Sequence, residues 1–282
     1  MTDPARLSDL APRYDAILCD VWGVIRDGHA LIPAAIEALQ RYRAGGGHVV
    51  LVSNSPRRSA SLLNLLDQMS APDDACDGAV TSGDATHDVL ASKAPGPAFK
   101  LGPDWDDPIY EGTGLDFAPL GESAFISCTG LLDYETETVD DYQALLAEGV
   151  ERGLEMVCAN PDLVVQVGER LLPCGGALAA RYEQLGGTTI YAGKPHAPIY
   201  AAARDRLAGI AGGPVDDVRL LAIGDGPGTD IAGANREGID AMFIAHGILG
   251  AELGGGFDAA AVERALAERG VSARWAADTL VW

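Results

Sequence analysis

Short apolar runs alternate along this chain with segments of helical period. The runs "AILC", "HVVLV" and "LLAIG" carry no carboxylate, lysine or arginine, which is typical of strands buried on both faces of a sheet. The segments between them carry apolar residues three or four positions apart, and several end at glycines, as helices do. This alternation predicts an α/β fold with a doubly wound parallel sheet.

The alternation breaks in the middle of the chain. A stretch rich in glycine, proline and aspartate covers residues 102–122, and "LVVQVGERLLPC" predicts a hairpin that turns at Gly168. A length of 282 residues suits two domains. We therefore predict a Rossmann-like core formed by residues 1–82 and 188–282, with residues 83–187 inserted as an α/β cap domain.

The charge of the chain limits its partners. Its 20 basic and 41 acidic residues give a formal net charge of −21. Such a field repels nucleic acids and anionic membranes, so we expect neither as a partner. A small phosphorylated metabolite is not excluded, because a local site can oppose the overall field.

Cysteine usage and the amino-terminal sequence bear on location. The five cysteines form no CxxC pair and no spacing typical of zinc sites, and "MTDPARLSDLAPRYD" has no hydrophobic signal region. No stretch approaches the length of a membrane-spanning helix. These features predict a reducing, cytoplasmic location.

Polar residues follow four of the predicted strands directly. Each could be an ordinary helix or turn cap when taken alone. Right-handed crossovers place the carboxyl ends of parallel strands at one edge of a sheet, so we expect these side chains to converge. Converging carboxylates need a cation, and hard oxygen ligands suit Mg²⁺, while serine and lysine complement phosphate. The residues are Asp20, Ser53, Asn54, Lys194, Asp225 and Asp230.

Several motifs resemble those of a known family. "DVWGV", "VSNS", "GKP" and "GDGPGTD", in this order, are similar to the motifs of the haloacid dehalogenase-like hydrolases. The insertion between the second and third motifs resembles the type II cap of that superfamily. "IPAAIEAL", "TSGDAT" and "CANPD" resemble class IIA, the subgroup that contains nitrophenyl-phosphatases and pyridoxal phosphate phosphatase.

The resemblance implies a magnesium-dependent phosphatase that acts on a small phosphorylated metabolite. Asp20 is then the nucleophile that forms an aspartyl-phosphate, and Lys194 offsets the charge around it. The cap closes over the site and selects the substrate. The phosphate-binding residues implied are Ser53, Asn54 and Lys194, and the implied metal ligands are Asp20, the Trp22 carbonyl, Asp225 and Asp230.

Trp22 departs from the family pattern. Family phosphatases usually carry a second aspartate there, which protonates the leaving group, and an indole N–H cannot do this. Three alternatives remain open. Asp27 in the following loop supplies the proton, the substrate has a leaving group that needs none, or the protein binds a phosphorylated ligand without useful catalysis and is regulatory.

Other polar residues are candidates for contact with the substrate. For each of them, an ordinary structural role as a turn residue, a helix start or a solvated surface residue is about as simple an explanation as contact with the substrate. "HGILG" at 246–250 follows a predicted strand and either borders the site or forms a glycine turn. The resembled group also includes cap-mediated dimers, which makes a homodimer one expectation. The candidates are Asp27, Arg57, Asn160, Asp162 and His196.

Overall fold

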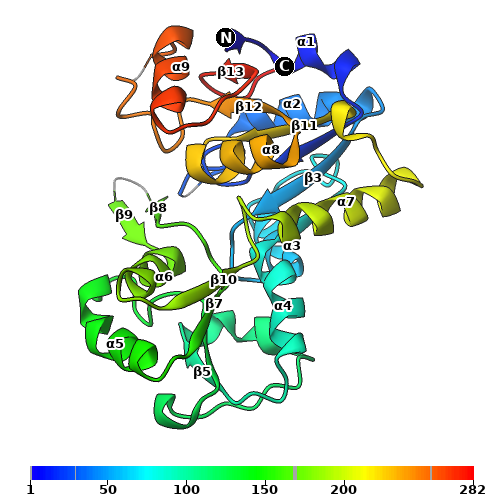
Figure 1. Ribbon diagram of the computed structural model, residues 1–282. Helices are drawn as coiled ribbons and strands as arrows, with labels where there is room; N and C mark the ends of the chain where they lie inside the picture. The colour runs from blue at the N-terminus through cyan, green and yellow to red at the C-terminus, as the bar shows by residue number, and fades with distance from the viewer. Residues whose placement is uncertain (1, 29, 168–169, 255) are drawn as a thin grey trace. The chain divides into compact units, whose positions relative to one another are not determined.

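Two α/β units make up the computed structural model, which describes residues 2–28, 30–167, 170–254 and 256–282 (Figure 1). Unit 1 comprises Met1–Ser53, Ala60–Val80 and Tyr200–Trp282, and unit 2 comprises Asn54–Ser59 and Thr81–Ile199. The predicted fold class, a doubly wound parallel sheet with an inserted α/β segment, is confirmed.

A seven-stranded sheet in the order β1-β13-β12-β11-β2-β3-β4 organises unit 1. The pairs from β1 through to β3 are parallel. From β2 the chain continues outward to β3, and from β11 it continues outward to β12 on the other side. The topological switch point therefore lies between β2 and β11, where open α/β sheets bind ligands. The strands are β1 (Asp3–Pro4), β2 (Ala16–Cys19), β3 (His48–Ser53), β4 (Gly78–Thr81), β11 (Leu220–Gly224), β12 (Asp240–Ile244) and β13 (Trp275–Ala277).

Helices connect these strands, as the periodicity predicts. Helix α2 (Pro33–Ala44) starts with proline, whose missing N–H is no loss in a first turn. The last buried residue of this helix is Tyr42. A Cβ on Gly47 would lie 2.2 Å from the Tyr42 ring, so position 47, just after the helix, requires glycine. The other helical segments are α1 (Leu7–Leu10), η1 (Ala11–Arg13), α3 (Ser59–Gln68), α7 (Ala197–Ala211), η5 (Asp217–Arg219), η6 (Pro227–Ile231), α8 (Ala232–Glu237) and α9 (Ala259–Glu268).

A four-stranded parallel sheet in the order β10-β7-β6-β5 organises unit 2. Its strands are β5 (Ala98–Leu101), β6 (Phe125–Cys128), β7 (Glu155–Cys158) and β10 (Thr188–Tyr191). The hairpin is antiparallel, with β8 (Val164–Val167) and β9 (Arg170–Pro173), and Gly168 lies outside the described residues. The helical segments are α4 (Ser82–Ser92), η2 (Asp104–Tyr110), η3 (Leu120–Glu122), η4 (Val139–Tyr142), α5 (Gln143–Glu151) and α6 (Gly175–Gln184).

Strand β10 differs from the sequence-based expectation. We assigned residues 188–191 to the core segment, but Thr188 pairs with Glu155 and Tyr191 with Cys158, so the strand belongs to the four-stranded sheet. Pairing partners are a long-range property that an apolar run does not carry. The domain boundaries at 82 and 188 stay predictions.

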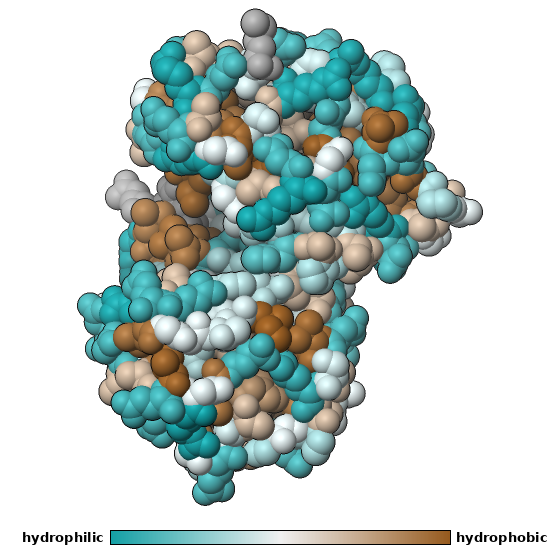
Figure 2. All heavy atoms as spheres, in the orientation of Figure 1, coloured by the Kyte–Doolittle hydropathy of each residue, from teal (hydrophilic) through white to brown (hydrophobic). Residues whose placement is uncertain are grey.

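The surface is largely hydrophilic on the side that Figure 2 shows, where hydrophobic residues form separate spots. In the part of the chain that the structure describes, no helix is both long and apolar enough to span a bilayer.

Asp84 fastens the start of helix α4 to the segment before α3. One carboxylate oxygen accepts hydrogen bonds from the Thr81 N–H and hydroxyl, each at 3.1 Å, and the other accepts from Arg58 Nε at 2.8 Å. The Ser59 N–H donates to the same carboxylate at 3.1 Å. Burial raises the pKa of Asp84, but the hydrogen bonds from Arg58, Ser59 and Thr81 together outweigh burial, and the net shift is downward.

We predict that Asp84→Asn lowers the free energy of unfolding by about 1–2 kcal/mol at pH 7, because charged acceptors make the stronger bonds. A lowered folded pKa gives stability that is present above the unfolded value of about 4 and lost as pH falls through the folded value. The difference between parent and variant in urea unfolding should therefore shrink from pH 7 to pH 3. Asp88→Asn is the control, since that side chain is 90% exposed on the same helix. A difference that is constant with pH would contradict the prediction.

Candidate active site

Three carboxylates meet at the switch point of unit 1. Asp20 follows β2, Asp225 follows the adjacent β11, and Asp230 lies in the π-helical turn η6. Each offers an oxygen that lies within 4.8 Å of the oxygens of the other two. Asp20 and Asp230 are buried and Asp225 is half-buried. The structure thus brings together the three acids that the motifs singled out.

Backbone hydrogen bonds hold these acids in place. The Asp20 N–H donates to the Ile223 carbonyl at 2.8 Å, which joins the ends of β2 and β11. The Ile248 N–H donates to Asp225 Oδ2 at 2.7 Å, so the "HGILG" loop borders the cluster. The Gly226 N–H donates to Asp230 Oδ2 at 3.1 Å.

Three glycines keep side chains away from the carboxylates. A Cβ on Gly23 would lie 2.1 Å from Asp225 Oδ2, and Gly23 also has a positive φ of +77°. A Cβ on Gly247 would lie 2.0 Å from the same oxygen, and one on Gly224 would lie 2.2 Å from Asp230 Cγ. Converging carboxylate oxygens in a glycine-lined space fit a divalent cation that prefers hard oxygen ligands.

Trp22 forms a pair with Arg26, which the sequence analysis missed. The Arg26 Cζ lies 4.1 Å from the centroid of the Trp22 ring, a cation–π contact. Arg26 is only 5% exposed, and it donates to the carbonyls of Asp27 at 3.1 Å and Gly28 at 3.2 Å. Burial lowers its pKa. Among the described residues no carboxylate lies within ion-pair distance of Arg26.

The remaining unit 1 candidates differ in their surroundings. Ser53 is buried at the end of β3, the neighbour of β2. Asp27 is exposed, and its Oδ1 accepts from the Ala30 N–H at 2.8 Å, which closes a turn. Its position therefore has a structural explanation, and its role as the proton donor stays a prediction.

In unit 2, the side chain of Asn54 holds the "GKP" segment. Asn54 Oδ1 accepts from the Lys194 N–H at 2.7 Å, and Nδ2 donates to the Lys194 carbonyl at 3.0 Å and to Asp162 Oδ1 at 2.8 Å. A Cβ on Gly193 would lie 2.7 Å from Asn54 Oδ1, so this position requires glycine. Lys194, 4% exposed, follows β10.

The other unit 2 candidates make local contacts. Asn160 Oδ1 accepts from the Asp162 N–H at 3.1 Å, as in an Asx turn. His196 stacks on Tyr191, with ring centroids 5.0 Å apart and planes 9° apart. Arg57 Nε donates to Oδ1 of Asp106 at 3.3 Å. Sequence reasoning missed Asp106, because it is one acid among several in a stretch that looked like a loop.

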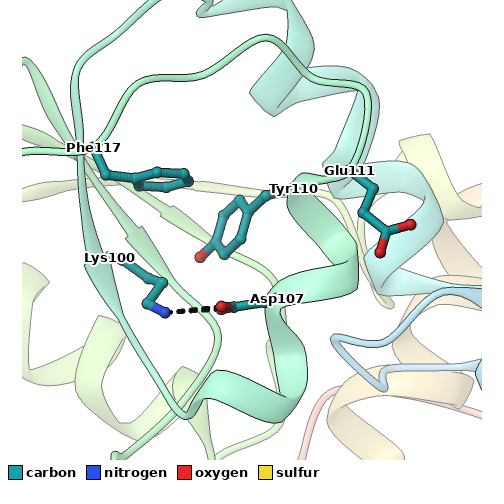
Figure 3. A pocket seen from close by; sticks show the side chains of 5 residues that line it. All are labelled: Lys100, Asp107, Tyr110, Glu111 and Phe117. Atoms are coloured by element: carbon teal, nitrogen blue, oxygen red, sulfur yellow. Dashed lines mark hydrogen bonds and ion pairs between the residues drawn. The ribbon is translucent and has the colours of Figure 1, made fainter.

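A separate pocket of about 440 Å³ lies in unit 2. In Figure 3, Tyr110 and Phe117 meet edge to face, with centroids 5.0 Å apart, and Lys100 donates to Asp107 at 2.9 Å. Glu111 completes the lining. None of the residues predicted from the motifs lines this pocket.

Comparison with known proteins identifies the class. Residues 17–116 match a family model described as haloacid dehalogenase-like hydrolase, and residues 191–268 match a second model described as HAD-hydrolase-like. A crystal structure of a haloacid dehalogenase-like hydrolase from Brucella suis 1330 is 43% identical, covers 99% of this chain and 100% of its own, and has a TM-score of 0.89. The chain belongs to the haloacid dehalogenase-like hydrolase family, as the motifs predict.

Two more distant relatives carry more specific names. The acid sugar phosphatase of Staphylococcus aureus strain USA300 is 25% identical over 244 residues, which cover 84% of this chain and 88% of that protein. A p-nitrophenyl phosphatase from Archaeoglobus fulgidus has the same fold, with 20% identity, a TM-score of 0.73, and coverage of 95% of this chain and 97% of its own.

We predict that Gly23→Ala weakens Mg²⁺ binding about 10- to 100-fold, since changes beside ligands typically cost that much. The new methyl group would collide with Asp225 Oδ2. Isothermal titration with MgCl₂ measures the effect. Gly46→Ala is the matched control, because Gly46 has a similar φ of +93° but nothing within 4 Å of the added Cβ. Equal Mg²⁺ affinity in both variants would contradict the assignment of this cluster as the metal site.

Proposed function

We propose that this protein is a magnesium-dependent phosphatase that hydrolyses a small phosphorylated metabolite through an aspartyl-phosphate intermediate. As a member of its family with curated relatives named acid sugar phosphatase, the chain is a phosphoric monoester hydrolase. The observation that carries the finer proposal is the convergence of the Asp20, Asp225 and Asp230 carboxylates.

In the proposed first step, a carboxylate oxygen of Asp20 attacks phosphorus. The bond from phosphorus to the leaving oxygen breaks, and its electron pair stays on that oxygen. Water then attacks the aspartyl-phosphate, which releases inorganic phosphate and regenerates the carboxylate. Asp20 is 7% exposed, so its surroundings in unit 1 shield the nucleophile from bulk water.

The proposed metal ligands are Asp20, Asp225 and the Trp22 carbonyl, with Asp230 as a further ligand or as support for one. When bound, Mg²⁺ neutralises charge on the carboxylates and on the phosphoryl oxygens. Support for this set comes from the three glycines that keep the space around the acids clear.

The proposed phosphate contacts come from Ser53, the backbone of Asn54, and Lys194. The amide side chain of Asn54 is already engaged with Lys194 and Asp162, which leaves the backbone as its means of contact. Lys194 offsets negative charge in a chain of net charge −21. The proposal includes a cytoplasmic location and a homodimer, and it includes no nucleic-acid or membrane partner.

Trp22 restricts the substrates that this site can turn over. Neither the indole N–H nor the stacked Arg26 is a proton donor near neutral pH. General acid catalysis is worth about 10²–10⁴ in rate. Its loss slows the departure of an alkoxide most, because an alkoxide is a strong base that leaves readily only when it is protonated. The alternative, a regulatory protein that binds a phosphorylated ligand without turnover, rests on Trp22 alone, and the phosphatase relatives do not favour it.

We predict that kcat/KM for a sugar phosphate falls about 10²- to 10⁴-fold below that for p-nitrophenyl phosphate, the range that a general acid supplies. Trp22→Asp should narrow this difference, because it restores a proton donor. Asp20→Asn should remove activity on both substrates. Steady-state kinetics with magnesium on the parent and both variants provide the measurement.

Equal rates on the two substrates in the parent would mean that another residue supplies the proton, and Asp27→Asn would then identify or exclude the nearest candidate. Binding of phosphate without turnover of any ester would favour the regulatory alternative.

A further inference from the structure

Asp106 differs from the other acids of its helical turn. Segment η2 carries three aspartates, and two of them, Asp104 and Asp107, accept hydrogen bonds from Lys100 at 2.9 Å each. Figure 3 shows the Lys100–Asp107 pair beside its pocket. Asp106 does not line that pocket and is only 2% exposed. Its carboxyl group is therefore buried within unit 2, where it pairs with Arg57 and not with Lys100.

The buried carboxyl group of Asp106 is incompletely satisfied. Oδ1 accepts from Arg57 Nε at 3.3 Å, while Oδ2 is buried and has no hydrogen-bond partner among the described residues. Burial raises the pKa of Asp106, and this effect exceeds the opposing effects of Arg57 and the Thr129 hydroxyl. A buried acceptor without a partner costs about 1–3 kcal/mol, so its presence calls for a functional explanation.

Arg57 is bonded on one side only. Its side chain is 46% exposed, and Nε carries the bond to Asp106. The two terminal nitrogens have no hydrogen-bond partner among the described residues. A guanidinium group that is held at Nε presents these nitrogens as a rigid, oriented fork. Asp106 thus fixes a hydrogen-bond donor that remains open to solvent.

This pair belongs to the same unit as two of the proposed phosphate contacts, Asn54 and Lys194. Arg57 lies in the short segment Asn54–Ser59, whose first residue clamps Lys194. Asp106 lies in the first helical segment after β5, and Lys194 follows β10 of the same parallel sheet. Both residues therefore come after carboxyl ends of strands, the edge at which parallel sheets bind ligands.

Hydroxyl and aromatic groups accompany the pair. Thr129 directly follows β6, and its hydroxyl would lie 1.9 Å from a Cβ on Gly102, the residue that follows β5. The ring of Trp105, 54% exposed, lies 6.3 Å from the ring of Tyr134 between centroids. Trp105 directly precedes Asp106 in the chain, and aromatic rings together with a few polar groups are typical of small-molecule sites.

Charge decides which ligand suits this pair. Arg57 is already balanced by a carboxyl group at 3.3 Å, so the pair has no surplus positive charge to attract a second anion. Its open nitrogens still donate hydrogen bonds, which the oxygens of neutral hydroxyl groups accept.

We propose that the terminal nitrogens of Arg57 bind hydroxyl groups on the neutral organic part of the phosphorylated substrate, and that Asp106 is the positioning residue that orients Arg57. This inference deepens the proposed phosphatase function and rests on it.

Direct binding tests the proposal without relying on turnover. Isothermal titration with magnesium present, on proteins that also carry Asp20→Asn so that no ester is hydrolysed, compares glucose 6-phosphate with propyl phosphate, whose organic part has no hydroxyl groups. The parent should bind glucose 6-phosphate more tightly by about 10- to 100-fold, the range expected for hydrogen bonds to a charged group. Arg57→Met should remove this preference, and Arg57→Lys should not restore it, because lysine lacks the fork.

Asp106→Asn should reduce the preference as well, and Asp107→Asn, on the same helical turn, should keep it. If Asp106→Asn does not fold, as thermal unfolding will show, the exposed Arg57 variants still decide the question. Equal affinity of the parent for the two esters would overturn the proposal. If Arg57→Met weakens the binding of both esters and of inorganic phosphate by the same factor, the proposal is also overturned, because Arg57 would then bind the phosphoryl group.

A carboxylated probe, 3-phosphoglycerate, tests whether Arg57 binds an anionic group of the substrate instead of a hydroxyl group. If Arg57→Met weakens the binding of this probe more than the binding of glucose 6-phosphate, the subsite binds an anion and the proposal is wrong. Failure of the phosphatase proposal gives a different result, namely no hydrolysis of any ester by the parent while the hydroxyl preference in binding persists.

Discussion

Electrostatic repulsion between three neighbouring carboxylates is the constraint on which the site in unit 1 depends. Asp20, Asp225 and Asp230 offer oxygens within 4.8 Å of one another, and two of these residues are buried, where charges interact strongly. The N–H groups of Gly226 and Ile248 donate hydrogen bonds to Asp230 and Asp225 and so offset part of this charge. A cluster of this kind is stable and useful when a divalent cation occupies it, which explains why glycines surround it.

The contact between Trp22 and Arg26 changes the charge of the site. Where family phosphatases usually carry a second acid, this chain has an indole ring with a buried guanidinium group 4.1 Å from its centroid. In place of an acid that can transfer a proton, the site has a positively charged pair whose N–H groups do not release their protons near neutral pH. The site that results can still support attack on phosphorus by Asp20, but it gives little help to a leaving group that must be protonated.

Local signals accounted for the acids of the site but not for their neighbours. Asp20 and Asp225 could be predicted because each directly follows an apolar run, and the ends of such strands meet at the switch point. Asn54 was expected beside the phosphate, and its side chain proved to be a clamp on Lys194, 140 positions away. Asp106 carried no distinguishing signal among nearby acids.

The sequence by itself determined most of the strands, most of the helices and the family, because hydrophobic period, glycine stops and motif order are local properties of the chain. It gave no signal for the short edge strands β1 (Asp3–Pro4) and β13 (Trp275–Ala277). Only the tertiary structure decided that β10 (Thr188–Tyr191) pairs with β7 rather than joining the larger sheet. It also decided that Arg57 meets Asp106, 49 positions away. Such contacts depend on which surfaces the folded chain brings together, and residue type and spacing do not encode that information.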